Sequence, residues 1–480
     1  MQTAILLLYL MILMPLCAMG AQRAWMIWAV WGLSPRTPPA EPQQWPVVTV
    51  QLPLFNERHV ATRLIEAVGA LDYPADALRI QVLDDSTDDT TDRAREAVRK
   101  LNDRGITATL LHRDKRPGFK AGALEAGLAV ADGDLIAILD ADFLPRTDFI
   151  KRLVPWFAAA DVGMVQARWG HLNADDSWVT RTQATLLDAH FCVEHAARHH
   201  TGRWFNFNGT AGMWRRAAIV DAGGWQHDTL TEDLDLSYRA QLAGWRFEYL
   251  DDVVVPAELP DTIVAFKTQQ ARWARGSIQT GRKLLGRIWR SPASLRVKLD
   301  ATAHLTANLG YPLMGILALL LPVAIAARGQ GGPLWLAAVD VSVFVLAFCS
   351  MLAFYATAVA RSGTPAGRRW LRIPAVLGVG LALSISQTAA VIAGLFGPVG
   401  TFERTPKRGE ATTELYRMPR PPLVAVEAML AIYLWVAFAL AASDGLWASL
   451  PFLALFAGGY SAMVFGTLVK PIGTGRVPGS

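Results

Sequence analysis

Hydrophobic residues along this 480-residue chain follow two different patterns. Between residues 47 and 268, short apolar runs rich in β-branched residues alternate with stretches of helical periodicity. This alternation predicts crossover units and a mainly parallel sheet, and so an α/β fold class. The predicted strands cover residues 47–52, 80–83, 108–111, 135–139 and 163–167. The predicted helices cover residues 59–71, 88–104 and 119–131.

The second pattern consists of long apolar stretches on both sides of that region. Residues 3–20 carry no charge, and no basic segment precedes them, so we interpret them as an uncleaved anchor rather than a signal peptide. Each later stretch approaches the roughly 20 residues that a membrane-spanning helix needs. These stretches cover residues 303–327, 334–360, 373–396, 424–442 and 446–468.

Charge placement sets the expected topology. Segments 361–372 and 397–423 are rich in arginine and lysine, which places both on the cytoplasmic side. The stretch between them is therefore not expected to cross, and its polar run at 384–388 suits lipid poorly. We predict a re-entrant or interfacial helix there and five spanning helices in all. The N-terminus would lie outside, and the α/β domain and the C-terminus inside.

The two patterns together divide the chain into parts. These are a transmembrane anchor with an interfacial segment (1–33), a proline-rich linker (34–46), a cytosolic α/β domain (47–268), a cationic interfacial helix region (269–300), two transmembrane helices (301–360), a cytosolic loop with the re-entrant helix (361–396), a second cytosolic loop (397–423), two further transmembrane helices (424–470) and a tail (471–480).

Composition narrows the class of function. Charged residues make up 18% of the chain, below the roughly 25% of a soluble domain, and the deficit lies in the apolar stretches. The net charge is +5, but the arginines cluster beside apolar segments, so we expect positive-inside loops and no nucleic-acid partner. Cys17, Cys192 and Cys349 are far apart, which predicts neither a disulfide framework nor a zinc site.

Two acidic clusters directly follow two predicted strands. Asp84 and Asp85 come after the second strand, and Asp140 and Asp142 come after the fourth. In a parallel sheet, ligands lie beyond the carboxyl ends of the strands, so both clusters are expected at one edge. Asp84 and Asp85 are candidates for binding the base or ribose of a nucleotide, and they also suit the N-cap of the next helix.

Asp140 and Asp142 form the candidate metal site. Residues i and i+2 of extended backbone point to the same side, which would direct both carboxylates at one ion. The chain has no glycine-rich phosphate loop at a strand–helix junction, so a diphosphate needs another source of positive charge. Mg²⁺ takes one or two carboxylates plus substrate phosphates, and we expect Mg²⁺ or Mn²⁺ here. The alternative is a solvated turn.

Asp233 is the candidate general base. It follows Thr231 and Glu232 at the start of a helical pattern, where acidic residues also suit the helix dipole whatever their function. Group transfer by direct displacement needs one carboxylate that takes the proton of the acceptor hydroxyl while the hydroxyl oxygen attacks. Because no covalent intermediate forms, no second nucleophilic carboxylate is required.

Cationic and aromatic residues complete the candidate chemistry. Lys120, near the start of a predicted helix, suits phosphate oxygens, but taken alone it is more typical of a solvated lysine. Arg272 can bind a pyrophosphate in a fork, and Trp273 offers a face on which a sugar ring can stack. Basic residues follow at helix-like spacing, so we expect a cationic helix on the membrane whose first turn faces the site.

These motifs resemble the processive family 2 glycosyltransferases of the cellulose synthase type. The segments that carry the resemblance are VQLPLFNE, QVLDDSTD, GFKAGAL, DADF, VQARW, FNGTAGMWR, AGGW, TEDLDL and QQARW. They look most like the plant cellulose-synthase-like A and C enzymes, which make β-1,4-mannan or glucomannan and the β-1,4-glucan backbone of xyloglucan. The resemblance implies a GT-A nucleotide-sugar domain inserted between transmembrane segments.

The resemblance also implies roles for single residues. Asp233 would be the base, and Asp140 and Asp142 would hold the metal. The implied nucleotide-sugar contacts are Asp84, Asp85, Lys120, Asp140, Arg272, Thr405 and Lys407. The implied acceptor contacts are Gly209, Thr210, Glu232, Gln269 and Trp273. Thr405 and Lys407 enter because residues 402–407, FERTPK, fit the F-x-x-T-x-K gating loop of bacterial cellulose synthases.

The implied function is a membrane-embedded, inverting, metal-dependent and processive β-glycosyltransferase. It would elongate a β-1,4-linked glucan, mannan or glucomannan from UDP-glucose or GDP-mannose and move the product across an inner, plasma or Golgi-type membrane. No motif reads the one hydroxyl that separates the two sugars. Two alternatives stay open: a non-processive glycolipid synthase acting on ceramide or diacylglycerol, and a non-catalytic polysaccharide-binding scaffold.

Overall fold

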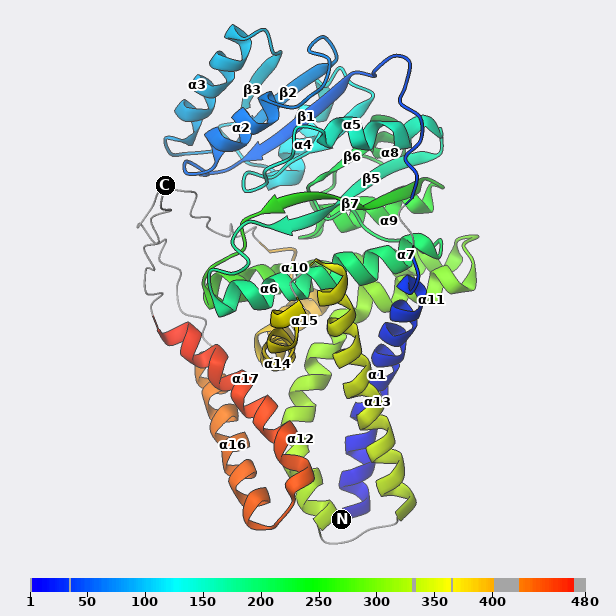
Figure 1. Ribbon diagram of the computed structural model, residues 1–480, viewed down its shortest axis with the longest axis vertical. Coiled ribbons are helices and arrows are strands. Elements are labelled where there is room, and N and C mark those ends of the chain that lie inside the picture. Colours follow the sequence, from blue (N-terminus) through cyan, green and yellow to red (C-terminus); the bar gives the residue numbers. More distant parts are fainter. Residues whose placement is uncertain (1, 34–35, 330–333, 364–365, 401–422, 470–480) are drawn as a thin grey trace.

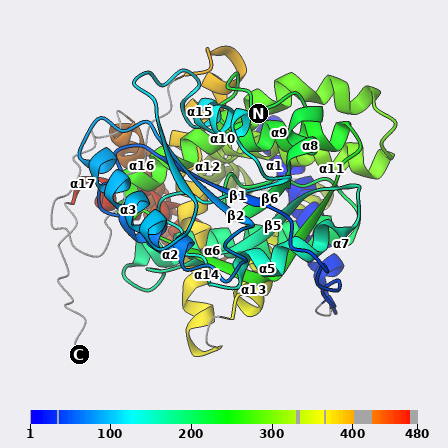
Figure 2. The same cartoon turned by 90° about the horizontal axis from the view of Figure 1, so that it is seen from above.

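The computed structural model describes residues 2–33, 36–329, 334–363, 366–400 and 423–469. Within these ranges an α/β domain sits on a group of long helices that extend away from it (Figure 1). Helices α6 and α10 run crosswise between the two parts, and α1 begins at the end of the group farthest from the domain (Figure 1). Viewed from the domain side, the sheet lies above the helix group (Figure 2).

The described part of the domain contains a seven-stranded sheet with the order β3-β2-β1-β4-β6-β5-β7. Among these strands β6 alone runs antiparallel to its neighbours. The strands are β1 (Val48–Leu54), β2 (Leu78–Asp84), β3 (Ala108–His112), β4 (Leu135–Ile138), β5 (Val162–His171), β6 (Gly212–Arg215) and β7 (Arg246–Ala257). The predicted mainly parallel sheet is therefore confirmed, and its five predicted strands correspond to β1–β5.

Two strands were missed by the hydrophobic pattern. Strand β6 has only four residues, and β7 carries Glu248, Asp251 and Asp252 within its apolar run. Four residues are too few to show a periodic pattern, and the acidic residues interrupt the apolar pattern of β7.

The two faces of the sheet pack against different helices because successive strand residues point to opposite sides. Leu135 and Ala137 of β4 join the core under α2, α3 and α5, whereas Ile136 and Ile138 join the core under α4, α7, α8 and α9. The helices are α2 (Ala61–Gly69), α3 (Thr90–Asp103), α4 (Phe119–Ala129), α5 (Phe149–Leu153), α6 (Trp178–Ala189), α7 (Ala196–His200), α8 (Arg216–Asp221) and α9 (Glu232–Leu242).

The second of these cores continues into the long helices. Met26 and Val30 of α1 and Phe354 of α13 are buried in the same cluster as Ile136 and Ile138. The domain and the helix group thus share one hydrophobic core. The remaining helices are α1 (Gln2–Val30), α10 (Ile263–Arg290), α11 (Leu295–Thr306), α12 (Gly310–Gly329), α13 (Leu334–Arg361), α14 (Ala366–Ala382), α15 (Ser384–Phe396), α16 (Val424–Ser443) and α17 (Leu450–Leu468).

Five segments of the described chain are long and apolar enough to cross a membrane. They are Thr3–Val30, Leu295–Ala327, Val341–Arg361, Val424–Ser443 and Trp447–Leu468. The helix pair Arg372–Ala382 and Ser384–Phe396, where the sequence predicts a re-entrant segment, bends by 46°. Broken spans and re-entrant segments both bend in this way.

Two of the arginines used for the topology prediction contact the domain directly. Nη2 of Arg361 lies 3.0 Å from Oδ2 of Asp251, and Nη2 of Arg372 lies 2.8 Å from Oδ1 of Asp175. Arg361 and Arg372, at the two ends of the segment 361–372, are therefore on the domain side of the helix group. The location of this segment in the cytosol stays a prediction.

Candidate active site

A cavity of about 180 Å³ lies at the carboxyl ends of the parallel strands, next to α9 and α10. The register explains its position: Leu54 of β1 pairs with Asp84 of β2, and Gln51 pairs with Ile138 at the end of β4. The loops after these strands therefore meet at one edge. The predicted site residues that line the cavity are Asp85, Lys120, Asp140, Asp142, Gly209, Glu232, Asp233, Gln269, Arg272 and Trp273.

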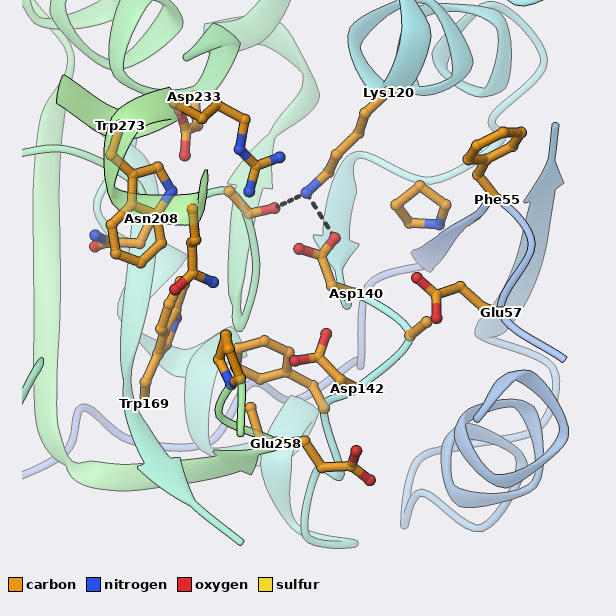
Figure 3. Close-up of a pocket in the computed structure, with 18 of the residues that line it drawn as sticks. Phe55, Glu57, Lys120, Asp140, Asp142, Trp169, Asn208, Asp233, Glu258 and Trp273 are labelled. Carbon is orange, nitrogen blue, oxygen red and sulfur yellow. Dashed lines mark hydrogen bonds and ion pairs between the residues drawn. The ribbon is translucent and has the colours of Figure 1, made fainter. Parts of the chain in front are cut away.

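Lys120 joins two walls of this cavity (Figure 3). Its Nζ lies 2.6 Å from Oδ1 of Asp140 and donates to the carbonyl oxygen of Gly209 at 2.9 Å. Burial lowers the pKa of the Lys120 ammonium, but Asp140, Glu232 and Asp233 outweigh that effect and raise it above its ordinary value. Lys120 is thus a site cation and not a solvated lysine.

The backbone conformation just before α4 places Lys120 at the cavity. Helix α4 begins at Phe119 directly after Gly118, whose φ of 72° is left-handed, and Phe119 itself has a φ of 50°. These two residues turn the chain sharply into the helix, so that Lys120 in its first turn reaches the cavity.

Asp233 lies in the first turn of α9, close to Lys120 and Arg272. Burial, together with the charge of Glu232, raises the pKa of Asp233 to about 7, although Lys120 and Arg272 oppose that shift. Oδ1 of Asp233 accepts a hydrogen bond from the backbone N–H of Leu234 at 2.8 Å. A carboxylate that titrates near neutral pH is suited to general base catalysis.

Gly209 lets the chain pass close to this carboxylate. Its φ is +81°, and a Cβ at this position would lie 2.9 Å from Oδ2 of Asp233. The next residue, Thr210, is fully buried and accepts a hydrogen bond from the backbone N–H of Asp140 at 2.8 Å. Thr210 therefore fixes the Asp140 loop and does not line the cavity with the other predicted acceptor residues.

Asp140 and Asp142 line the same cavity, but the expected reason was wrong. The backbone is a tight turn and not extended, because the N–H of Phe143 donates to the carbonyl oxygen of Asp140 at 3.0 Å. Across the described chain, His, Cys, Asp and Glu side chains nowhere gather as a metal site of three or more. Two carboxylates on one turn match the small protein donor set of Mg²⁺ or Mn²⁺ when phosphate oxygens complete the coordination.

Asp84 and Asp85 are adjacent, but Asp85 lines the cavity and Asp84 does not. Asp84 is fully buried, and its carboxylate accepts hydrogen bonds from the Thr91 hydroxyl at 2.6 Å and the Ser86 N–H at 3.1 Å. Burial opposes ionisation, but these bonds and that of His112 lower the pKa of Asp84. A direct contact with a nucleotide requires a side chain that reaches the cavity, and Asp84 does not line it.

Asp85 lines the cavity, and two arginines, Arg113 and Arg116, donate hydrogen bonds to its carboxylate. Nε and Nη2 of Arg113 donate to its two carboxylate oxygens, each at 2.7 Å, and Nε of Arg116 donates to Oδ2 at 3.4 Å. The Arg116 guanidinium also lies 3.3 Å from the centre of the Phe55 ring. Asp85, Arg116 and Phe55 together form a flat, polar end of the cavity that suits a nucleobase and its ribose.

The opposite side of the cavity is aromatic. The rings of Trp169 and Trp273 lie 6.5 Å apart, and Trp169 packs edge-on against Phe143 at 5.1 Å (Figure 3). Trp273 and Gln269 come from α10, which begins at Ile263 and not at the start of the Q-x-x-R-W motif. The motif thus lies in the second and third turns of the helix, so the expectation that its first turn faces the site was wrong.

Comparison with known proteins agrees with this geometry. Residues 46–276 match the family described as glycosyltransferase-like family 2. This segment is a family 2 glycosyltransferase domain.

The glycosyltransferase domain is similar to plant proteins named for mannan synthesis. Glucomannan 4-beta-mannosyltransferase 1 of Oryza sativa subsp. japonica is 45% identical over 252 residues, which cover 52% of this chain and 48% of that protein. Glucomannan 4-beta-mannosyltransferase 2 of Arabidopsis thaliana is 45% identical over 252 residues, which cover 52% of this chain and 47% of that protein. The chain spans about half the length of the curated relatives it matches.

A solved structure shares the fold. The mannosyltransferase PcManGT from Pyrobaculum calidifontis, in complex with GDP-Man and Mn²⁺, aligns with a TM-score of 0.52 at 21% identity. The alignment covers 82% of this chain and 99% of that chain. The predicted GT-A fold is therefore confirmed for the glycosyltransferase domain, which apolar helices flank on both sides.

Several cavity residues were missed as site residues by the sequence analysis. They are Phe55, Glu57, Arg116, Trp169, Asn208 and Glu258. Phe55, Trp169 and Asn208 belong to segments that carry the family resemblance, so that signal could have identified them. Asn208 is held by its Nδ2, which lies 2.9 Å from Nε2 of His190. The predicted donor contacts Thr405 and Lys407 lie outside the described residues.

Proposed function

We propose that this protein is a membrane-embedded, inverting β-glycosyltransferase that adds hexose units from a nucleotide sugar to a β-1,4-linked glycan, with mannan or glucomannan as the product. One observation carries the proposal. The cavity of the family 2 domain combines a carboxylate whose pKa is raised to about 7, two half-buried cations and an aromatic wall. The 45% identity to glucomannan mannosyltransferases favours mannose as the transferred sugar.

Asp233 acts as the base in this proposal. Its ionised carboxylate takes the proton of the acceptor hydroxyl while that oxygen forms a bond to the anomeric carbon of the donor. The bond between the anomeric carbon and the phosphate oxygen breaks, and the nucleoside diphosphate leaves with the electron pair. Attack from the side opposite the leaving group inverts the anomeric centre. A pKa near 7 lets Asp233 be ionised before the reaction and accept the proton during it.

Arg272 and Lys120 offset the charge that develops on the diphosphate. Both are half-buried beside the carboxylates Glu232, Asp140 and Asp233, and desolvation lowers the pKa of Arg272 despite those neighbours. Mg²⁺ or Mn²⁺ held by Asp140 and Asp142 would add a Lewis acid at the same diphosphate. The mannosyltransferase PcManGT, whose structure contains GDP-Man and Mn²⁺, gives this pairing of donor and metal a precedent.

Trp169 and Trp273 serve as the acceptor platform. Sugar rings stack on aromatic faces, and Gln269 on the same helix offers an amide to the acceptor hydroxyls. Processive elongation, transfer of the product across the membrane and closure of a loop with Thr405 and Lys407 over the donor extend the proposal. They rest on the resemblance to cellulose synthases.

The domain side of the membrane would be the cytosol, where nucleotide sugars are made. The contacts of Arg361 and Arg372 with the domain agree with the excess of positive charge expected on that side. The protein would reside in an inner, plasma or Golgi-type membrane.

The test is a transfer assay with the purified protein in lipid nanodiscs. Radiolabelled GDP-mannose and UDP-glucose are supplied separately and together, with Mg²⁺ or Mn²⁺. Insoluble product that a β-mannanase degrades supports a mannan or glucomannan synthase. Product degraded only by a β-1,4-glucanase moves the assignment to a glucan synthase, and label in lipid without polymer moves it to a glycolipid synthase.

A further inference from the structure

A second cavity, of about 270 Å³, lies among the membrane-crossing helices. Helices α6 and α10 each line both this cavity and the candidate active site. Leu187 of α6 and Gln269 of α10 line the first cavity, and their chain neighbours Leu186 and Gln270 line the second. Helix α10 therefore directs Gln269 toward the candidate active site and Gln270 toward the second cavity.

The lining of this second cavity is largely hydrocarbon and aromatic. Helices α1, α12, α13, α14 and α17 contribute to it. Phe452 packs edge-on against Phe344 at 4.4 Å and against Phe348 at 5.3 Å, and all three rings are only partly buried. A glycan placed here would bury many hydroxyls without partners, which is costly, whereas an alkyl chain would not.

The polar lining residues belong to the end of the cavity nearest the domain. Arg23 lies near the domain end of α1, Asn308 and Tyr311 lie where α12 begins, and Gln270 lies on α10. Nη1 of Arg23 donates to the Met19 carbonyl oxygen at a long 3.4 Å. Its buried Nε has no hydrogen-bond partner among the described residues. The guanidinium also lies 5.5 Å from the centre of the Phe354 ring. A guanidinium with an unused N–H donor at the polar end of an apolar cavity is suited to a phosphate.

We propose that this cavity binds an anionic membrane phospholipid, with one acyl chain among the apolar helices and the phosphate at Arg23. Basic pockets between membrane helices commonly bind anionic head groups. The lipid would contact Gln270 and so support α10 from the side opposite the sugar site. This proposal concerns a different cavity and does not depend on the proposed transfer reaction.

Gly380 provides the decisive variant. It lines the cavity on α14, and a Cβ at this position meets nothing within 4 Å, so Gly380→Leu places its side chain in the space of the acyl chain without a clash at the first carbon. Gly458 on α17 is the matched control. A Cβ there also meets nothing within 4 Å, and Gly458 does not line the cavity.

The experiment is native mass spectrometry of the purified full chain with phosphatidylglycerol or phosphatidylcholine. We expect one retained phosphatidylglycerol on the unmodified protein and on Gly458→Leu, and at least a tenfold lower occupancy on Gly380→Leu. We expect Arg23→Gln to bind both lipids equally. Equal retention by the two leucine variants would overturn the cavity site, and an unchanged lipid preference in Arg23→Gln would overturn the assignment of the phosphate.

A second measurement does not depend on how well a variant folds. A phosphatidylglycerol with a diazirine on its acyl chain should label the side chains of Met351 or Leu381, which line the cavity, when the labelled residues are identified by fragmentation of the peptides. Label confined to lipid-facing positions such as Leu346, which is 50% exposed, would contradict the proposal. Displacement of the probe by a soluble β-1,4-mannan oligosaccharide would show that the cavity takes glycan instead.

Discussion

Nζ of Lys120 lies 2.6 Å from Oδ1 of Asp140 and also donates to the carbonyl oxygen of Gly209, 89 residues along the chain. One side chain thereby fixes the loop after β4 to the loop that passes in front of Asp233. Lys120 is the one cationic residue in the first turn of α4, and it is also close enough to Asp233 to lower the pKa of that carboxyl. Several testable consequences concern this cluster.

Replacement of Lys120 should impair catalysis and shift its pH dependence. Lys120→Ala removes a cation that lowers the pKa of Asp233, so that pKa should rise above about 7 and the activity profile should move to higher pH. We expect a loss of roughly 10²-fold or more in kcat, as for other removed electrostatic contacts to a developing charge. Lys100→Ala, on the exposed face of α3, is the control. An unchanged pH profile in Lys120→Ala would contradict the coupling.

The activity of the unmodified protein should rise with pH through about 7 and then level off, because Asp233 must be ionised to act as a base. Asp233→Asn should lose roughly 10²–10⁴-fold in kcat. The same substitution should raise the thermal midpoint at pH 8. A raised pKa means that the protonated carboxyl stabilises the fold, and that this contribution is lost as pH rises through about 7. Full activity of Asp233→Asn would remove Asp233 from the reaction.

Comparison of Gly209→Ala with Gly202→Ala should distinguish the effect of a contact with Asp233 from the effect of backbone strain. Gly209 and Gly202 both have left-handed φ values, +81° and +65°, but a Cβ at Gly202 meets nothing within 4 Å. Both alanine variants should lose about 1–2 kcal/mol of stability from the left-handed backbone. Only Gly209→Ala should also lose activity, since its Cβ would lie 2.9 Å from Oδ2 of Asp233. Equal activity of the two variants would show that the contact is unimportant.

Removal of the Trp273 ring should weaken acceptor binding. Trp273→Leu takes away one face of the aromatic wall, and we expect roughly a tenfold higher KM for a β-1,4-mannan oligosaccharide, equivalent to about 1.4 kcal/mol. The KM for the sugar nucleotide should stay within twofold. Trp204→Leu, at a tryptophan that packs against Tyr238 and does not line the cavity, is the matched control. A change only in the KM for the sugar nucleotide would mean that Trp273 contacts the donor and not the acceptor.

A buried ion pair connects the helix of the Q-x-x-R-W motif to the last two membrane-crossing helices. Nζ of Lys267 lies 2.5 Å from Oε2 of Glu427 on α16 and donates to the Thr467 hydroxyl on α17 at 3.2 Å. Glu427→Gln should destabilise the protein by about 3–5 kcal/mol, because it leaves Lys267 buried without its counter-charge. The lowered thermal midpoint should recover in the double variant Lys267→Met, Glu427→Leu.

The control is the more exposed ion pair between Nζ of Lys151 and Oδ1 of Asp72, which lie 2.7 Å apart. Solvent screens such pairs, so Lys151→Ala should change stability by at most about 1 kcal/mol. Equal effects of Glu427→Gln and Lys151→Ala would mean that water reaches the buried pair.

Local sequence determined the elements of this protein and the chemistry at their ends. Hydrophobic periodicity predicted β1–β5, the helices α2–α4 and the apolar segments, because each depends on neighbours within a few residues. The rule that ligands lie beyond parallel strands correctly placed Asp85, Asp140 and Asp142 at one cavity.

Tertiary structure decided which side chains face that cavity and what surrounds them. Asp84 and Asp85 are adjacent and chemically identical, yet Asp84 is buried in the interior, where Thr91 of α3 and His112 of β3 contact its carboxylate. The approach of Lys120 to Gly209, of Trp169 to Trp273 and of Lys267 to Glu427 joins residues 89, 104 and 160 positions apart. Such contacts, and the raised pKa of Asp233 that burial produces, depend on the packing of the whole chain and leave no local pattern in the sequence.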